Sequence, residues 1–336
     1  MATLRRRTVS YSKWGYFFIA PFFIVYALAS FYPLASTFYF SFFKKLVKFG
    51  QDMGPTTFVG LQNFIDIFTP NPNGVIEVGK YAGNTFIIWI IGFIPQIIVS
   101  LLLASWFTDL RLRLKATGFF KVVIYLPNVI MAAAISFLFS SLFADTGPIN
   151  QIMAAAQGAD NFQIQIATGE VGFRFFASIP AARIIIAGIN FLMWFGNTTI
   201  MLMAAIHGID PTLYEASAID GANATQIFWR ITMPLIRPIL LFVLVTSLIG
   251  GLQMFDIPNV LFQNGSGGVN ATSRTLIMFL NQQMQGTRNY GRGGALSIVL
   301  FIIGGGLSMM VFYLMRDKDV AEERKRRKKS KGAKLL

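Results

Sequence analysis

Six stretches of eighteen or more residues contain no Asp, Glu, Lys or Arg. A helix of that length and composition crosses about 30 Å of hydrocarbon. The whole sequence agrees, because 54% of its 336 residues are hydrophobic and 34 are Phe. We therefore predict an all-α membrane protein with six transmembrane helices. The predicted spans are 14–43, 81–108, 122–144, 184–209, 238–255 and 293–315.

The basic residues predict the orientation of these spans. Most of the 29 Lys and Arg fall on one side of the predicted membrane, which by the positive-inside rule is the cytoplasmic side. Both termini and the loop 210–234 are therefore expected in the cytoplasm. Lys44, Lys45 and Lys48 follow the first span on the other side and weaken the asymmetry there. The expected organisation is a basic N-terminus 1–13, a six-helix domain 14–316 and a basic tail 317–336.

The formal net charge is +14, which raises the question of nucleic acid as a partner. Many of these bases lie in the tail, directly after the last predicted span. A basic run at that place is typical of contact with anionic membrane lipids. We expect membrane lipids and no nucleic acid as partners. Cys is absent, which excludes disulfides, thiol catalysis and thiolate metal sites.

The loop 210–234 contains signals for two short helices. Asp210 before Pro211 is a typical helix start, and Thr212 with Glu215 offers an alternative capping box. Gly221 permits a sharp change of direction. We expect a second short helix over residues 224–232, which Pro234 would end or kink.

The segment Tyr214-Glu-Ala-Ser-Ala-Ile-Asp-Gly-Ala222, followed by Pro234, resembles the EAA motif of the permease subunits of bacterial ABC importers, in particular the maltose-transporter-type family for carbohydrates. In that family the loop docks into a cleft of a separate ATPase. The resemblance implies coupling roles for the residues that match the motif. These are Tyr214, Glu215, Ala216, Ala218, Asp220, Gly221, Ala222 and Pro234. Without the resemblance, an amphipathic loop on the bilayer surface would explain the same residues.

The resemblance also implies an ABC type I importer permease fold, a bacterial plasma (inner) membrane location and a set of partners. These are a second homologous permease subunit, two ABC ATPase subunits and an extracytoplasmic solute-binding protein. The sequence contains no phosphate-binding Gly-x-x-x-x-Gly-Lys-Ser/Thr motif. We therefore expect no enzymatic activity and no cofactor in this chain, with ATP and Mg on the partner ATPase.

Polar side chains within the predicted spans are the candidates for solute contact, because they are costly in lipid and usually face a cavity or another helix. Asn190 and Trp194 are four residues apart and share one helical face. Amides match sugar hydroxyls and aromatic rings stack on sugar faces. Helix bridging is the alternative role for Asn and Ser. The candidate set is Asn128, Asn190, Trp194, Ser247, Gln253 and Asp256.

The resemblance places Asn128 and Asn190 at positions that contact sugar in the maltose-transporter-type permeases. Trp194 stands where that pattern has a small residue, so the identity of the sugar stays open. We expect an importer permease for a sugar or oligosaccharide. Three alternatives remain: an importer permease for another solute, a secondary carrier that works without ATP, and a membrane scaffold or receptor that binds a partner through the tail, which would leave the loop of Glu215 unexplained. A carrier predicts acidic residues inside the membrane, and the six predicted spans contain none.

Overall fold

The computed structural model describes residues 12–45, 47–48, 51–52, 56–109, 115–157, 172–262 and 265–315. Among these residues, five helices are long and apolar enough to cross a membrane. A sixth span is present if two helices joined by an 88° bend are counted together. The predicted basic N-terminus up to residue 11 and the tail 317–336 lie outside the described residues, as do Arg111 and Arg113.

By its contacts the chain divides into two units, residues 1–70 with 280–299 and residues 71–279 with 300–336. The first unit begins with a helical run in which a π-helical turn joins two α-helices. Its elements are α1 (Ser12–Tyr26), η1 (Ala27–Phe31), α2 (Tyr32–Ser41), β1 (Phe43–Lys44), β2 (Val47–Lys48), β3 (Gln51–Asp52), β4 (Thr57–Phe58), α3 (Gln62–Phe68), η5 (Gln282–Gly286) and the first turns of α15 (Tyr290–Met315).

Two short antiparallel strand pairs follow α2. Phe43 pairs with Phe58 in β1–β4, and Val47 pairs with Asp52 in β2–β3. The amide of Asn63, at the start of α3, donates to the carbonyl oxygens of Ser41 at 2.8 Å and Phe43 at 3.0 Å. Because Asn63 is buried, this side chain fixes α3 against the end of α2.

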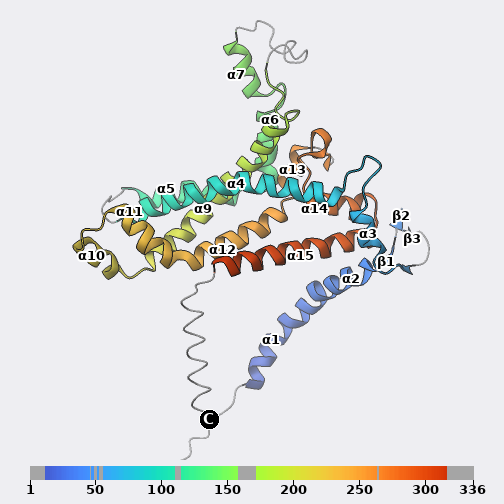
Figure 1. The fold of residues 1–336 in the computed structure, drawn as a ribbon, viewed down its shortest axis with the longest axis horizontal. Helices are drawn as coiled ribbons and strands as arrows, with labels where there is room; N and C mark the ends of the chain where they lie inside the picture. The colour runs from blue at the N-terminus through green and yellow to red at the C-terminus, as the bar shows by residue number, and fades with distance from the viewer. Residues whose placement is uncertain are drawn as a thin grey trace, which may run out of the picture. The chain divides into compact units, whose positions relative to one another are not determined.

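The second unit is a helical bundle built around α9. Figure 1 shows α4 and α9 side by side, with α12 next to them. Its elements are α4 (Glu77–Thr108), α5 (Thr117–Val129), α6 (Ala132–Leu142), α7 (Pro148–Ala156), α9 (Ile179–His207), α10 (Pro211–Ile219), α11 (Ala224–Ile227), η2 (Phe228–Thr232), α12 (Met233–Leu252), α13 (Asp256–Leu261), η4 (Val269–Ala271) and α14 (Leu276–Asn281).

Two buried apolar clusters hold this bundle together. One joins Ile88 of α4 to Ile186 and Ile189 of α9, and the other joins Ala104 of α4 to Leu202 of α9 and Ile236 of α12. Burial of such side chains contributes about 1.5–3 kcal/mol each in water. In a membrane, where lipid also solvates them, close packing is the larger contribution.

The third predicted span, 122–144, is not one straight helix. It overlaps α5 (Thr117–Val129) and contains α6 (Ala132–Leu142), and these two helices meet at 88°. Ile130 has an extended backbone with ψ of 139°, and Met131 with ψ of 136°. Pro127 has no N–H, so it cannot donate the helical hydrogen bond to the residue four positions earlier. Val129, the last residue of α5, is β-branched and therefore has a lower helix propensity. Both residues weaken the C-terminal end of α5.

The fifth predicted span begins earlier than its charge-free window. α11, η2 and α12 run on from one another, so the apolar helix extends over Ala224–Leu261. Pro234 therefore does not end a short helix. It lies in the first turn of α12, after a π-helical turn, a position at which its missing N–H removes little.

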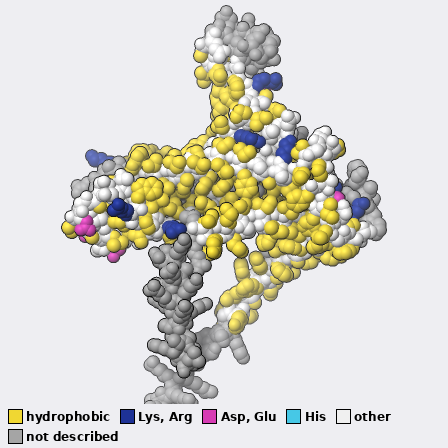
Figure 2. Space-filling model, in the orientation of Figure 1, with side chains coloured by type: hydrophobic (Ala, Val, Ile, Leu, Met, Phe, Trp, Pro, Cys, Tyr) yellow, Lys and Arg dark blue, Asp and Glu magenta, His cyan; other side chains and the backbone are white. Residues whose placement is uncertain are grey.

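The surface of the protein is strongly apolar. Apolar side chains cover most of the face shown in Figure 2, and charged side chains are few on it. Many large apolar side chains are exposed on α1, among them Phe18 at 76%. Contiguous apolar surface of this extent is typical of a face that meets lipid or another protein.

Candidate functional site

The segment between α9 and α12 forms a helical hairpin. The carboxylate of Asp210 accepts the backbone N–H of Thr212 at 3.0 Å and caps α10. Gly221 follows α10 with φ of +74°, a backbone conformation that favours glycine. The side chains of Asn223 and Gln226 form a capping box at the start of α11. Asp210 thus caps α10 as predicted, while the capping box lies at Asn223 and not at Thr212.

The hairpin is tied to the bundle through Tyr214. Its hydroxyl lies 3.2 Å from the hydroxyl of Thr232, and its ring packs on the cluster of Ala104, Leu202 and Ile236. The hydrogen bond to Thr212 lowers the pKa of Asp210. The opposite face of the hairpin is open, with Ile219 87% exposed.

Several predicted coupling residues lie together on this hairpin. Glu215, Ala216, Ala218, Asp220, Gly221 and Pro234 are exposed, and Tyr214 and Ala222 are partly buried. Tyr214, Glu215 and Ala218 also line a cavity of about 430 Å³, whose other walls include His207 and Asp109. Among the described residues, no group of three or more potential metal ligands comes together.

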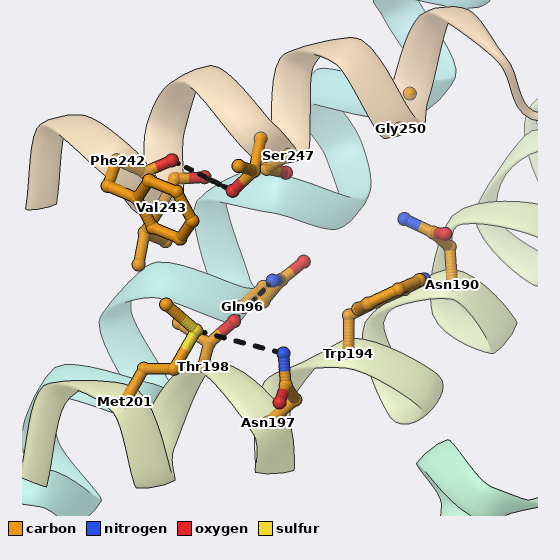
Figure 3. Close-up of a pocket in the computed structure, with 12 residues that line it drawn as sticks. Gln96, Asn190, Trp194, Asn197, Thr198, Met201, Phe242, Val243, Ser247 and Gly250 are labelled. Atoms are coloured by element: carbon orange, nitrogen blue, oxygen red, sulfur yellow. Dashed lines mark hydrogen bonds between the residues drawn. The ribbon is translucent and has the colours of Figure 1, made fainter. Parts of the chain in front are cut away.

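A second cavity, of about 360 Å³, opens between α4, α9 and α12. Figure 3 shows polar side chains from α4 and α9 facing α12 across it. The described residues that line it carry amides, hydroxyls and one indole, and none is charged. They are Gln96, Asn190, Trp194, Asn197, Thr198, Met201, Phe242, Val243, Thr246, Ser247, Gly250 and Gly251.

Helical periodicity explains how these residues come together. Asn190, Trp194, Asn197 and Met201 recur every three or four residues along α9 and so form one stripe. Val243, Ser247 and others repeat in the same way along α12. The cavity lies where the two stripes face each other, and its size is within the range of ligand pockets.

Comparison with known protein families gives one match that covers most of the chain. Residues 96–322 match the family described as the binding-protein-dependent transport system inner membrane component. The chain belongs to this family. It is therefore a multi-pass permease component of the inner membrane and a transport protein, not an enzyme.

Curated relatives match over nearly the full length of this permease. The lactose transport system permease protein LacF of Rhizobium radiobacter is 28% identical, over 95% of this chain and 100% of that protein. The arabinooligosaccharides transport system permease protein AraP of Bacillus subtilis is 30% identical, over 88% of this chain and 87% of that protein. The trehalose/maltose transport system permease protein MalF of Thermococcus litoralis is 28% identical, over 90% and 93%.

The fold of the permease is also found in a solved structure. A crystal structure of a bacterial ABC transporter involved in the import of the acidic polysaccharide alginate matches with a TM-score of 0.69. The match covers 90% of this chain and 94% of that chain at 20% identity. This likeness shows the fold.

The structure places three of the six predicted solute contacts in the cavity of the permease. Asn190 and Trp194 line it from α9, and Ser247 lines it from α12. The hydroxyl of Ser247 accepts the indole N–H of Trp89 at 3.2 Å, so its own proton is left to donate.

The other three candidates lie elsewhere. Asn128 donates to the carbonyl oxygen of Met193 at 3.0 Å and so bridges α5 and α9. Gln253 and Asp256 are exposed beyond the end of α12 and are not among the residues that line the cavity. A role for these three residues in solute contact stays a prediction.

Sequence reasoning missed Gln96, Asn197, Thr198 and Thr246 in the cavity wall. For Asn197 a signal was present, because it lies seven residues after Asn190 and so continues the same helical face. For Gln96 the signal is weaker. It is one amide in a long apolar span, and its partner Thr198 is 102 residues away in the chain.

Proposed function

We propose that this permease is the membrane-spanning subunit of an ATP-driven ABC importer, and that it translocates a sugar or oligosaccharide delivered by an extracytoplasmic binding protein. The relatives named for lactose, arabinooligosaccharides and trehalose/maltose support this class of solute. The observation that carries the proposal is the hairpin of α10 and α11. It is capped at both helix starts and tied to the bundle on one face, while the other face is open.

The hairpin is suited to coupling with an ATPase. Its free face combines the apolar Ile219 and the small Ala216 with the acidic Asp220, while Glu215 and Ala218 are exposed in the wall of the adjoining cavity. An exposed apolar side chain surrounded by charges is typical of a protein contact. In this proposal the hairpin docks in the cleft of an ABC ATPase, which holds ATP and Mg.

The proposed topology follows from the same assignment. Both termini and the hairpin lie in the cytoplasm, and the bent pair α5–α6 serves as the third of six spans. The cavity of Asn190, Trp194 and Ser247 then lies within the membrane-spanning bundle. We propose that it contacts the solute together with the corresponding surface of a second, homologous permease subunit. ATP binding and hydrolysis on two ATPase subunits would favour one and then the other of two conformations of the permease pair.

The test is affinity purification of the tagged permease from its native membrane in mild detergent. Recovery of an ATPase and a second permease is expected, with ATP-dependent uptake after reconstitution. Gly221→Asp should abolish recovery of the ATPase, because it adds a charged side chain at the docking tip, at a positive φ that glycine adopts most readily. The matched control is Gly74→Asp. Gly74 has the same φ of +74° and is exposed, and a Cβ at this position would meet no atom within 4 Å.

Undiminished recovery of the ATPase with Gly221→Asp would refute docking through the hairpin. Transport by the lone protein in vesicles without ATP would refute the importer and favour a secondary carrier.

A further inference from the structure

The side chain of Gln96 has one polar atom without a hydrogen-bond partner among the described residues. It lies in α4, with its side chain between α9 and α12 (Figure 3), and it is 3% exposed. Its Nε2 donates to the hydroxyl of Thr198 at 2.8 Å. Its Oε1 is buried and has no hydrogen-bond partner among the described residues.

A buried carbonyl oxygen without a partner is unfavourable, and such groups are rare in folded proteins. The surroundings of Gln96 offer an explanation, because this residue belongs to the wall of the 360 Å³ cavity. A donor that enters the cavity and displaces the atoms now covering Oε1 would complete its hydrogen bonding. In this arrangement Nε2 is bonded to Thr198 and Oε1 is the end of the amide without a partner among the described residues.

The chemistry of the wall limits what that donor is. Besides Gln96, the wall contains further side chains with a hydroxyl or an amide on α9 and α12, and Trp194 provides a ring that is 46% exposed. None of the described residues that line the cavity is charged. A carboxylate or an ammonium group would therefore enter without a charged partner from this wall, at a large desolvation penalty. Hydroxyl groups both donate and accept, and they match this wall.

We propose that the permease takes a neutral, hydroxyl-rich sugar and that Gln96 is a specificity-determining residue whose Oε1 accepts a hydrogen bond from one sugar hydroxyl. This inference rests on the proposed function, since it assigns the class of solute to the same cavity. It separates this permease from an importer of acidic sugars, although the alginate transporter shares its fold.

The test uses the full transporter, purified with its partners and reconstituted in proteoliposomes with its binding protein and ATP. The probes are lactose, maltose, trehalose and arabinotriose as neutral sugars and an alginate trisaccharide as the acidic one. Uptake of a neutral probe and none of the acidic one is expected. Uptake is then measured for the set of single-deoxy analogues of the sugar that is transported.

The wild-type transporter should import one deoxy analogue about tenfold more slowly than the parent sugar, the effect of one lost hydrogen bond of roughly 1.4 kcal/mol. Gln96→Met removes the acceptor and keeps the length of the side chain. In this variant the ratio of the two import rates should lose that factor of about ten relative to the wild type. Because the binding protein is the same in both measurements, its own discrimination cancels from the comparison.

Thr198→Val is the matched control, since it breaks the same link between α4 and α9 but leaves the oxygen of Gln96 in place. It should still discriminate against the analogue. If Gln96 only joins the two helices, both variants slow all sugars alike and the wild-type preference persists in both, which overturns its role as acceptor. Gln96→Leu is a second variant in case Gln96→Met does not assemble.

The remaining outcomes separate the two proposals. In one outcome the ATPase and the second permease copurify while the transporter takes up the acidic probe or fails to take up any neutral probe. That result overturns the proposed class of solute but not the importer. A permease recovered without either partner, and without ATP-dependent uptake, overturns the proposed function itself.

Discussion

Gly196 of α9 lies directly against the backbone carbonyl of Ile124 in α5, so that a Cβ at this position would overlap the carbonyl oxygen. The neighbouring atom belongs to the backbone and has no rotamer into which it can move. We predict that Gly196→Ala separates α5 from α9 and lowers the free energy of unfolding by about 1–3 kcal/mol, as overpacking does in other cores. The measurement is the midpoint of thermal unfolding of the permease in mild detergent.

The control for this prediction lies on the same helix. Gly188→Ala introduces the same methyl group where no atom lies within 4 Å. Because Ala is favoured over Gly in a helix by up to about 1 kcal/mol, this variant should be as stable as the wild type or slightly more stable. Equal midpoints for the two variants would show that a Cβ at position 196 does not destabilise the packing of α9 against Ile124.

The elements that were predictable from the sequence are those with local causes. The Asp210 cap and the left-handed Gly221 depend on a few neighbouring residues, and the long spans depend on runs of apolar side chains. The bend between α5 and α6 was missed because an apolar window reports length and not direction. At Ile130 and Met131 the break is made by two extended residues within a sequence that stays apolar.

The candidate site was predictable only in part for a similar reason. Asn190 and Trp194 share a helical face, which a sequence reveals by itself. The contacts of Gln96 with Thr198 and of Trp89 with Ser247 join helices that are far apart in the chain. A single sequence contains no signal for such pairs, so the role of Asn128 as a bridge to Met193 and the place of Gln96 in the wall came from the structure.

The cap of α10 predicts a specific effect of pH. The backbone hydrogen bond from Thr212 lowers the pKa of Asp210 from its ordinary value of 3.8. The ionised carboxylate therefore stabilises the hairpin above that value, and this stabilisation is lost as the pH falls through the lowered pKa of the folded state. The protection factors of the amides in the first turn of α10, which correct hydrogen exchange for its intrinsic dependence on pH, should be higher at neutral pH than in acid.

Two substitutions separate the charge of Asp210 from its hydrogen bond. Asp210→Asn keeps an acceptor oxygen, so the first turn should stay protected and lose its dependence on acid. Asp210→Ala removes the acceptor and should expose the turn at every pH. Equal protection in Asp210→Ala and the wild type would mean that packing of Tyr214 alone holds the helix in place.

In the first unit, Asp66 of α3 joins the first turn of α15. Its carboxylate accepts from Gln62 at 2.8 Å and from Arg292 at 3.1 Å. The hydrogen bond from Gln62 and then the pairing with Arg292 lower the pKa of Asp66 from 3.8. Both ends of the ion pair are partly exposed, so solvent weakens it. A double-mutant cycle of Asp66→Asn and Arg292→Gln should give a coupling of up to about 1 kcal/mol.

The coupling of Asp66 and Arg292 should also depend on pH. A carboxylate whose pKa is lowered by folding contributes fully above 3.8, and its contribution is lost as the pH falls through the lower folded value. The cycle should therefore give its full coupling at neutral pH and none well below 3.8. A coupling that is unchanged in acid would assign the effect to shape and not to charge.

The largest loss of stability in the second unit is expected at Asn84, which is buried in α4. Its amide donates to the carbonyl oxygens of Ala271 at 3.0 Å and Arg274 at 3.1 Å, and its oxygen accepts from Arg183 at 2.8 Å. Ala271 has a φ of +53°, so this loop is held in a strained backbone conformation that needs outside support.

Asn84→Leu leaves two carbonyl oxygens and a guanidinium group without this partner and should lower the free energy of unfolding by about 2–3 kcal/mol. Lys80→Met is the control, because Lys80 donates to the same loop at Asn270, 2.6 Å away, but from a partly exposed position. It should change stability by less than about 0.5 kcal/mol. Thermal unfolding of both variants in mild detergent measures the difference. If the two variants are equally stable, the buried hydrogen bonds of Asn84 contribute no more to stability than the hydrogen bond of Lys80. The turns within the loop would then set its conformation.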